Sequence, residues 1–484
     1  MFSENAYAWT VRAASAWGAI GSRRRTRQRL NDLMRLARAV CTQGITAALC
    51  GGVLAGCVGS WSRARDASTQ YSAAADRPGP DFDVLHYDVQ IAPQLDGRID
   101  GQSRIAIRSL RDDLREVRFS TSDLDVRGVN PLVREVARSN EDVVVTLSRA
   151  LRQGEVATVV LAFFGTPSRG YVANGTFAYT DYWACAWMPC TQDRPGDKAT
   201  LTLSISTPPG IESLGPGALV SSTPQRDGAI VHIWRLERPH PSYLFAFAVG
   251  RFAESRVLSP HLEARAFEPL TEELAAAFTD TERMRAFFSA AAGLPLPSEP
   301  YIQLVVPGAV AQESATHSSL GLNYLAAMRD DPSEDWLVAH ELAHQWWGNL
   351  VTCASWRDFW LNEGIVTFMV AAWKEQRWGR HAYDREMMLA RRRLDGAVAA
   401  GFDVPLTFEG RFPNGAVRRA IAYSKGALFM DVLRTRLGEE RFWAGLREFT
   451  RANAGGVVDS RDFQVAMEAA AGEPLQDVFD AWVY

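Results

Sequence analysis

Two histidines and a glutamate in the second half of the chain have the spacing of a catalytic metal site. His340 and His344 are four residues apart, so on a helix they lie on the same face, where two imidazoles can bind one small cation. Glu341 lies beside them and is positioned to take a proton from a metal-bound water. A catalytic zinc keeps three protein ligands and one open position, so this pattern requires a third ligand.

Glu363 is the expected third ligand. It follows His344 by 19 residues, next to a helix that we expect over 365–375. This spacing is typical of gluzincins, in which a glutamate on the following helix completes the site. An isolated His-Glu-x-x-His on a chance amphipathic helix is the alternative, and the Trp-Trp-Gly-Asn run at 346–349 argues against it. We predict one zinc per chain, although such a ligand set also takes cobalt or manganese.

The segments around these residues, and others far from them, resemble the aminopeptidase N family of zinc metallopeptidases. The resemblance covers residues 82 to about 430 and rests on five motifs: HELAHQWWGNLVT at 340–352, WRDFWLNEG at 356–364, MPCTQDRP with the following KA at 188–199, PSYLFAFAVG at 241–250, and YSKGA at 423–427. The combination implies a peptidase, and peptides as its substrates.

The pattern of apolar residues changes once along the chain. Alternating, β-branched runs separated by Gly, Pro and Asp predict strands from Phe82 to about Phe252, and helical periodicity follows from about Glu268. The family implies an antiparallel β-saddle or sandwich and then a mostly helical, thermolysin-like catalytic domain. We therefore expect an α+β protein with domains at 81–255 and 256–484. Because the chain stops at Tyr484, we expect the large C-terminal helical domain of most relatives to be absent.

Three further residues receive roles from the resemblance alone. Tyr423 matches the tyrosine that stabilises the developing oxyanion opposite the zinc, a donor that the chemistry requires. Glu313 lies 27 residues before His340, about where the family's glutamate binds the free amine of the substrate. The segment around it departs from the family's Gly-Ala/Gly-Met-Glu-Asn and reads GAVAQES at 308–314. Asp181 is the nearest candidate for a second amine anchor.

The first 57 residues have the pattern of a secretory leader. Arg35 and Arg38 precede an apolar run that ends in Leu-Ala-Gly-Cys at 54–57, which resembles the lipobox of bacterial lipoproteins. A weak transmembrane helix is the alternative, and the polar residues within the run disfavour it. We expect lipidation at Cys57, a flexible stalk over 58–80, and an exported protein anchored to the periplasmic face of a membrane, the outer membrane in particular. Translation could start at Met1 or Met34.

Composition and charge add few constraints. The 484 residues carry a formal net charge of −4, so no basic excess indicates a nucleic-acid partner, and no obligate protein partner is evident. Cys185 and Cys190 are close enough to form a disulfide in an oxidising compartment, but spacing alone does not decide this. Two alternatives to an aminopeptidase stay open: a zinc endopeptidase or other zinc hydrolase that needs no free amine, and a non-catalytic envelope scaffold with a zinc site.

Overall fold

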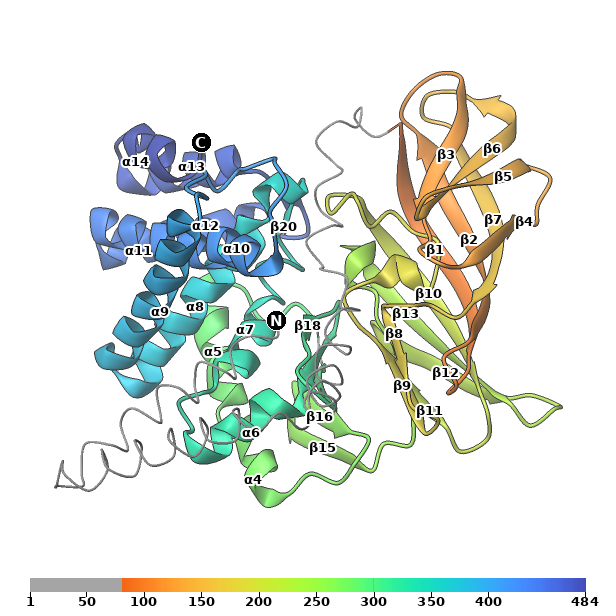
Figure 1. The fold of residues 1–484 in the computed structure, drawn as a ribbon, viewed down its shortest axis with the longest axis horizontal. Helices are drawn as coiled ribbons and strands as arrows, with labels where there is room; N and C mark the ends of the chain where they lie inside the picture. Colours follow the sequence, from red (N-terminus) through yellow and green to blue (C-terminus); the bar gives the residue numbers. More distant parts are fainter. Residues whose placement is uncertain (1–80, 299) are drawn as a thin grey trace, which may run out of the picture. The chain divides into compact units, whose positions relative to one another are not determined.

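The described part of the chain begins with strands whose side chains alternate between buried and exposed, as the sequence predicts. The computed structural model describes residues 81–298 and 300–484, and Figure 1 shows their fold. In β10 (Lys198–Thr207) every second side chain is buried, so one face of the strand packs on the core. The predicted order, a β-rich region followed by a mostly helical region, is confirmed.

The largest sheet has seven strands, which are antiparallel with one exception. In spatial order they are β12 (Ala218–Pro224), β13 (Ile230–Pro241), β10, β1 (Phe82–Pro93), β2 (Ile99–Ser109), β7 (Val156–Gly165) and β4 (Asp125–Gly128). The pair β1–β10 is parallel, which departs from the purely antiparallel sheet that we expected. A parallel pair needs a long connection, and here most of the β-rich region lies between the two strands.

Two smaller sheets complete the β-rich region. One contains β3 (Leu114–Ser120), β6 (Asp142–Leu151) and β5 (Val133–Ser139); the other contains β11 (Glu212–Leu214), β14 (Ala248–Gly250), β9 (Phe177–Thr180) and β8 (Tyr171–Ala173). The short 3₁₀ helices η2 (Ala184–Ala186) and η3 (Ser242–Leu244) lie in the connections after β9 and β13. The connection that follows β9 carries Asp181 towards the helical region.

A five-stranded sheet joins the β-rich region to the helices. Its order is β15 (Glu254–Ser259), β16 (Leu262–Ala266), β17 (Tyr301–Val306), β19 (His317–Gly321) and β18 (Ala311–Glu313). Every residue of β17 is buried. Ile302, Leu304 and Val306 pack in the core of the β-rich region, whereas Tyr301 and Val305 pack in the helical core. One strand therefore contributes to both cores. The predicted domain boundary at 255/256 falls inside β15 and stays a prediction.

The helical region surrounds the candidate site. Its main elements are α4 (Glu272–Ala275), η4 (Ala276–Phe278), α5 (Thr281–Ala292), α6 (Leu322–Asp330), α7 (Trp336–Ala343), β20 (Thr352–Cys353), η5 (Trp356–Asp358), α8 (Trp360–Trp378), α9 (Arg380–Ala399), α10 (Gly415–Arg419), the π-helix η6 (Ala420–Lys425), α11 (Gly426–Leu437), α12 (Glu439–Ala452), β21 (Val457–Val458), α13 (Ser460–Ala471) and α14 (Gln476–Trp482). Helices α8 and α9 run side by side in Figure 1, and α8 also contacts α7, α11 and η6.

The predicted leader over 1–57, with its lipidation site at Cys57, and the predicted stalk over 58–80 lie outside the described residues. Within the described residues, no helix has both the length and the apolar character needed to cross a bilayer.

Candidate active site

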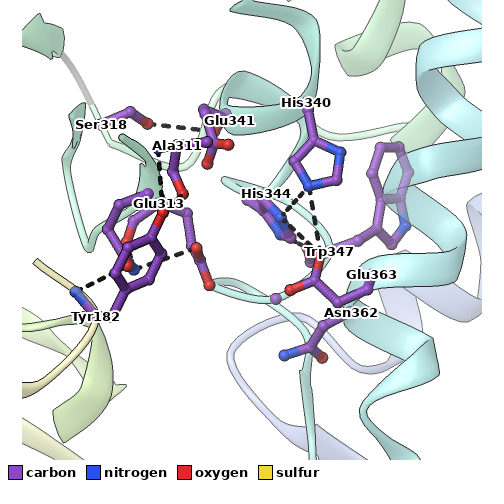
Figure 2. Close-up of polar contacts among 12 residues, drawn as sticks. Tyr182, Ala311, Glu313, Ser318, His340, Glu341, His344, Trp347, Asn362 and Glu363 are labelled. Carbon is purple, nitrogen blue, oxygen red and sulfur yellow. Dashed lines mark hydrogen bonds and ion pairs between the residues drawn. The ribbon is translucent and has the colours of Figure 1, made fainter. Parts of the chain in front are cut away.

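The two histidines lie where helical spacing predicts. His340 is in the last turn of α7 and His344 is the residue that ends the helix, so both imidazoles point to the same side (Figure 2). Their Nε2 atoms are 3.1 Å apart, and both side chains are buried. The Nδ1 atom of His344 lies 3.0 Å from the carbonyl oxygen of Trp347. A carbonyl can only accept, so Nδ1 carries a proton and Nε2 faces the site, where it can bind a metal ion once it is deprotonated.

Glu363 comes from the first turn of α8. Its Oε2 atom lies 3.3 Å from Nε2 of His340 and 3.4 Å from Nε2 of His344. The helix begins at Trp360 rather than at the expected residue 365, because the apolar side chains that open it are buried and extend the packed helix. The carboxylate therefore stands near a helix N-terminus, where negative charge is favoured.

A close contact between backbones holds Glu363 next to the following π-helix. A Cβ atom on Gly364 would lie 2.7 Å from the Cα atom of Gly426, which is closer than any side chain allows. Only glycine therefore fits at these two positions without moving the helices apart. This packing places α8, which carries Glu363, against η6, which carries Tyr423.

The three ligand atoms fit a zinc ion. Atoms that coordinate zinc tetrahedrally at about 2.0–2.1 Å are about 3.3–3.4 Å apart, close to the three separations seen between His340, His344 and Glu363. Oε2 of Glu363 is buried and has no hydrogen-bond partner in the described part of the chain. Burial opposes ionisation, but His344 and His340 hold the pKa of Glu363 well below its ordinary value. A bound cation would satisfy this buried oxygen.

Glu313 and Glu341 form a second cluster with His344. One ligand atom from each of the three side chains lies within 4.8 Å of the others. Burial raises the pKa of Glu313 to about 7 and raises that of Glu341 well above its ordinary value. Burial lowers the pKa of His344, but Glu363, Glu313 and Glu341 outweigh it and raise that pKa to about 10, so the carboxylates favour positive charge at this point. The predicted amine anchor Glu313 thus lies beside the metal ligands.

The carboxylate of Glu341 has an oxygen atom that can accept a proton. Its side chain is only 2% exposed, and its Oε2 atom has no hydrogen-bond partner among residues 81–298 and 300–484. The backbone carbonyl of Glu341 accepts a hydrogen bond from the hydroxyl of Ser318, which ties α7 to β19. The backbone of Glu341 is therefore held in place, whereas Oε2 of its carboxylate accepts no hydrogen bond within the described residues.

The ring of Tyr423 stacks on the imidazole ring of His340. The two rings are 6.0 Å apart between centroids and nearly parallel, at 7°. Tyr423 belongs to the π-helix η6, a wider turn than an α-helix and one that is often found at functional sites. Burial raises the pKa of its hydroxyl well above the ordinary value, so the hydroxyl keeps its proton and can donate a hydrogen bond.

Asp181 does not join either cluster. It follows β9, is half-buried, and burial raises the pKa of its carboxyl group to about 6. No hydrogen bond links this carboxyl group to Glu313 or to the ligand residues in the described part of the chain. Its neighbour Tyr182 instead contacts β18. The hydroxyl of Tyr182 donates to the carbonyl of Ala311 at 2.8 Å (Figure 2).

Tyr182 and Gln312 are the residues near the site that the sequence did not reveal. The backbone N–H of Tyr182 donates to Oε1 of Gln312 at 3.0 Å, and Nε2 of Gln312 donates to the Glu313 carboxylate at 3.2 Å. These contacts hold β18, and with it Glu313, against the β-rich region. The contact between Tyr182 and Gln312 joins residues 130 positions apart, which no local pattern encodes.

Cys185 and Cys190 form a disulfide in the same connection. The backbone N–H of Cys185 donates to Oε1 of Gln192, whose amide donates to the carbonyl of Tyr182. The disulfide therefore closes a short loop that supports Tyr182. Cys353 is a buried free thiol, as its isolated position predicts.

Residues 316–482 match the family described as the Peptidase family M1 domain. Over these residues the chain is similar to M1 peptidases. The matched segment contains His340, Glu341, His344, Glu363 and Tyr423. Glu313 and Asp181 lie before its first residue, so the match itself says nothing of the two amine anchors.

Curated relatives extend the similarity beyond the M1 domain. The chain is 29% identical over 310 residues to leucine aminopeptidase 2 of Emericella nidulans, covering 61% of this chain and 50% of that protein. It is 28% identical over 443 residues to aminopeptidase A of Gloydius brevicauda, covering 82% of this chain and 46% of that protein. The chain thus spans about half the length of the curated relatives it matches.

Solved structures share the fold of the M1 domain and of the β-rich region. The M1 zinc metallopeptidase from Deinococcus radiodurans superposes with a TM-score of 0.69 at 24% identity, over 83% of this chain and 94% of that one. Native yeast LTA4 hydrolase superposes with a TM-score of 0.71 at 21% identity, over 84% of this chain and 68% of that one. The predicted layout, a β-sheet domain followed by a mostly helical domain, is confirmed.

Proposed function

We propose that this protein is a zinc-dependent aminopeptidase with one zinc ion per chain, which releases N-terminal residues from peptides. The observation that carries the proposal is the near-equilateral triangle of His340 Nε2, His344 Nε2 and Glu363 Oε2, with Glu341 close to His344 and Tyr423 stacked on His340. The aminopeptidases and the zinc metallopeptidase among the relatives support it. When bound, zinc supplies a Lewis acid that polarises the scissile carbonyl and makes water more acidic.

Glu341 and Tyr423 carry out the other two steps of the proposed hydrolysis, proton transfer and stabilisation of the oxyanion. The unpartnered oxygen of Glu341 takes a proton from the attacking water and later delivers it to the leaving amine. The hydroxyl of Tyr423 keeps its proton and donates a hydrogen bond to the oxyanion that develops in the transition state. These two roles account for hydrolysis, but they do not restrict cleavage to the end of a peptide.

Glu313 provides that restriction. Its carboxylate lies beside His344 and Glu341, at the edge strand β18, where a peptide can add alongside. An ammonium group at this carboxylate places the first peptide bond next to the ligand triangle. Asp181 makes no comparable contact, so the proposal assigns the amine to Glu313 alone.

The test compares a leucine anilide that has a free amine with its N-acetylated form. An aminopeptidase hydrolyses the free-amine substrate and leaves the acetylated one nearly untouched, and Glu313→Gln reduces this discrimination. Equal rates on both substrates would instead identify an endopeptidase or another zinc hydrolase. Binding of zinc without hydrolysis of any substrate in a broad panel would identify a scaffold.

We also propose that the protein is an exported lipoprotein anchored through Cys57 to the periplasmic face of the outer membrane. The leader pattern and the lipobox-like ending at 54–57 support this location. Metabolic labelling with a radioactive fatty acid tests it, with Cys57→Ser as the control. The label must enter the wild-type protein and be absent from the variant.

A further inference from the structure

Two side-chain amides that follow the metal-binding helix bind one backbone carbonyl next to the amine anchor. Nε2 of Gln345 donates to the carbonyl oxygen of Ser314 at 3.1 Å, and Nδ2 of Asn349 donates to the same oxygen at 2.8 Å. All three residues are buried. Ser314 directly follows Glu313, so these two hydrogen bonds connect the segment of the metal ligands to the segment of the predicted amine anchor.

On the metal side, both donors are fixed to His344. Gln345 is the next residue in the chain, and the backbone N–H of Asn349 donates to the carbonyl oxygen of His344 at 3.0 Å. The backbone N–H of Leu350 donates to the carbonyl oxygen of Gln345 at 3.3 Å, which closes the turn that both donors share. The two amides therefore follow the position of the helix end that carries His344.

On the anchor side, the carbonyl belongs to the turn between β18 and β19. The backbone N–H of Ser314 donates to the carbonyl oxygen of His317 at 2.9 Å, and Glu313 pairs with Ser318 across the two strands. Glu313 is thus the last strand residue before a hydrogen-bonded turn. Because the two amides hold the first carbonyl of that turn, they determine where the end of β18 lies relative to the metal ligands.

Stability alone does not explain an amide at position 349. The Oδ1 atom of Asn349 is buried and accepts no hydrogen bond in the described part of the chain, so the side chain is satisfied only at its donor end. A buried polar atom without a partner costs free energy, and an apolar side chain of similar size would avoid that cost. The amide at this position therefore indicates that its bond to Ser314 serves the site.

The chemistry of an aminopeptidase requires a fixed distance between the amine anchor and the metal. In a peptide, the nitrogen atom of the first residue is about 2.5 Å from the carbonyl carbon that is attacked, because only the Cα atom lies between them. The group that binds the ammonium and the ligands that hold the metal must match this short, invariant length. A misplacement of about 1 Å can lower the rate about 100-fold.

We propose that Gln345 and Asn349 are positioning residues that set the distance between the amine anchor Glu313 and the metal ligands, an inference that rests on the proposed aminopeptidase function. The two amides act through the carbonyl of Ser314 and do not touch the substrate. They hold Glu313 where its carboxylate meets the ammonium group of a peptide whose first carbonyl lies at the ligand triangle.

The experiment uses the zinc-loaded full-length enzyme and two thiols that differ only in an amine. Both 2-amino-4-methylpentane-1-thiol and 4-methylpentane-1-thiol bind zinc through sulfur, but only the first has an ammonium group for Glu313. Titration calorimetry gives both dissociation constants for the wild type, Gln345→Met, Asn349→Leu and Glu313→Gln, and for Gln345→Met combined with Glu313→Gln. Gln464→Met is the matched control, because Gln464 is a buried glutamine of α13 whose amide donates to Glu468 at 2.9 Å.

The proposal expects a loss that is confined to the aminothiol. The wild type should bind the aminothiol more tightly than the plain thiol. Gln345→Met and Asn349→Leu should each weaken the aminothiol about 5-fold to 50-fold, leave the plain thiol within about 2-fold, and retain zinc in metal analysis. In the Glu313→Gln background, Gln345→Met should change neither affinity by more than about 2-fold. Gln464→Met should bind both thiols as the wild type does.

Equal weakening of both thiols overturns the proposal, since it means that the amides support the metal site or the fold as a whole. Unchanged affinities in both single variants also overturn it, as does a loss in the Glu313→Gln background as large as the loss in the wild type. A wild type that binds the two thiols equally, or that hydrolyses no free-amine anilide, contradicts the proposed function and this inference with it. That outcome is distinct, because it is seen without any substitution.

Discussion

The ammonium group of Lys198 donates a hydrogen bond to the carbonyl oxygen of Asn349, 3.2 Å away. Lys198 begins β10 in the β-rich region, and Asn349 follows the metal-binding helix. The same ammonium lies 3.0 Å from the carbonyl of Leu350, and 3.4 Å and 2.8 Å from those of Gly455 and Gly456. The side chain of Lys198 therefore links two loops of the helical region to the β-rich region.

Lys198→Met should loosen the metal site from a distance. The change leaves four carbonyls without their donor, which should lower the free energy of unfolding by about 2–4 kcal/mol. The side-chain amide of Asn349 donates to the carbonyl of Ser314, next to Glu313, so metal release to a chelator should become faster and KM should rise. Chemical denaturation and chelator kinetics check this. Lys198→Arg keeps the positive charge and should partly restore both the free energy of unfolding and the slow release of metal. Wild-type behaviour of the Lys198→Met variant would show that Lys198 does not support the site.

Glu341→Gln should abolish hydrolysis without releasing the metal. Glutamine has the shape of glutamate but cannot accept the proton of the attacking water, so kcat should fall about 100-fold to 10,000-fold. Metal analysis should still find one zinc per chain, because Glu341 is not among the three ligands. His344→Ala is the contrasting variant, and it should lose both metal and activity. A Glu341 variant that retains zinc and full activity would show that another group handles the proton.

Tyr423→Phe should lower kcat about 100-fold to 1,000-fold, the usual effect of removing one donor to an oxyanion. The stack with His340 depends on the ring and not on the hydroxyl, so KM and the melting temperature should change little. Steady-state kinetics and thermal unfolding separate these effects. A rise in KM at constant kcat would assign Tyr423 to substrate binding instead.

The sequence was sufficient to predict that His340, His344 and Glu363 lie together, because one helical turn fixes most of the geometry of the cluster. The separation of His340 and His344 leaves little freedom once α7 forms, and the offset to Glu363 places the third ligand on the next helix. The start of that helix was five residues off, because a burial that only the tertiary structure provides extends α8 back to Trp360. Local periodicity thus predicted that the helix exists, but it did not predict the residue at which the helix begins.

The contacts around the site that involve Tyr182 and β18 could not be predicted, because they join residues far apart in the sequence. Tyr182 reaches β18 from a connection about 130 residues earlier, and its backbone adopts a positive φ of 32°, which the local sequence does not suggest. The parallel pairing of β1 with β10 is likewise a property of the whole sheet.

His240 should make the protein sensitive to acid. Its side chain is 2% exposed, and burial lowers its pKa to about 4, below the value of about 6.5 in an unfolded chain. The unfolded state therefore binds more protons between these values, so stability is complete above pH 6.5 and falls as the pH drops to 4. At pH 4 the loss from this residue is about 3 kcal/mol. Denaturation of the wild type and of His240→Gln across this range should give a shallower pH dependence for the variant, and parallel curves would contradict the prediction.

Reduction of the disulfide between Cys185 and Cys190 should weaken substrate binding more than catalysis. The bridge closes a loop of six residues, so its loss should cost about 2 kcal/mol of unfolding free energy. It also frees the segment that supports Tyr182, whose contacts with Ala311 and Gln312 hold Glu313 in place. We therefore expect a phosphine reductant to raise KM for free-amine substrates while kcat stays within about 2-fold. The double variant with alanine at both cysteines should show the raised KM without reductant and no further response to it; a response in that variant would trace the effect to another group.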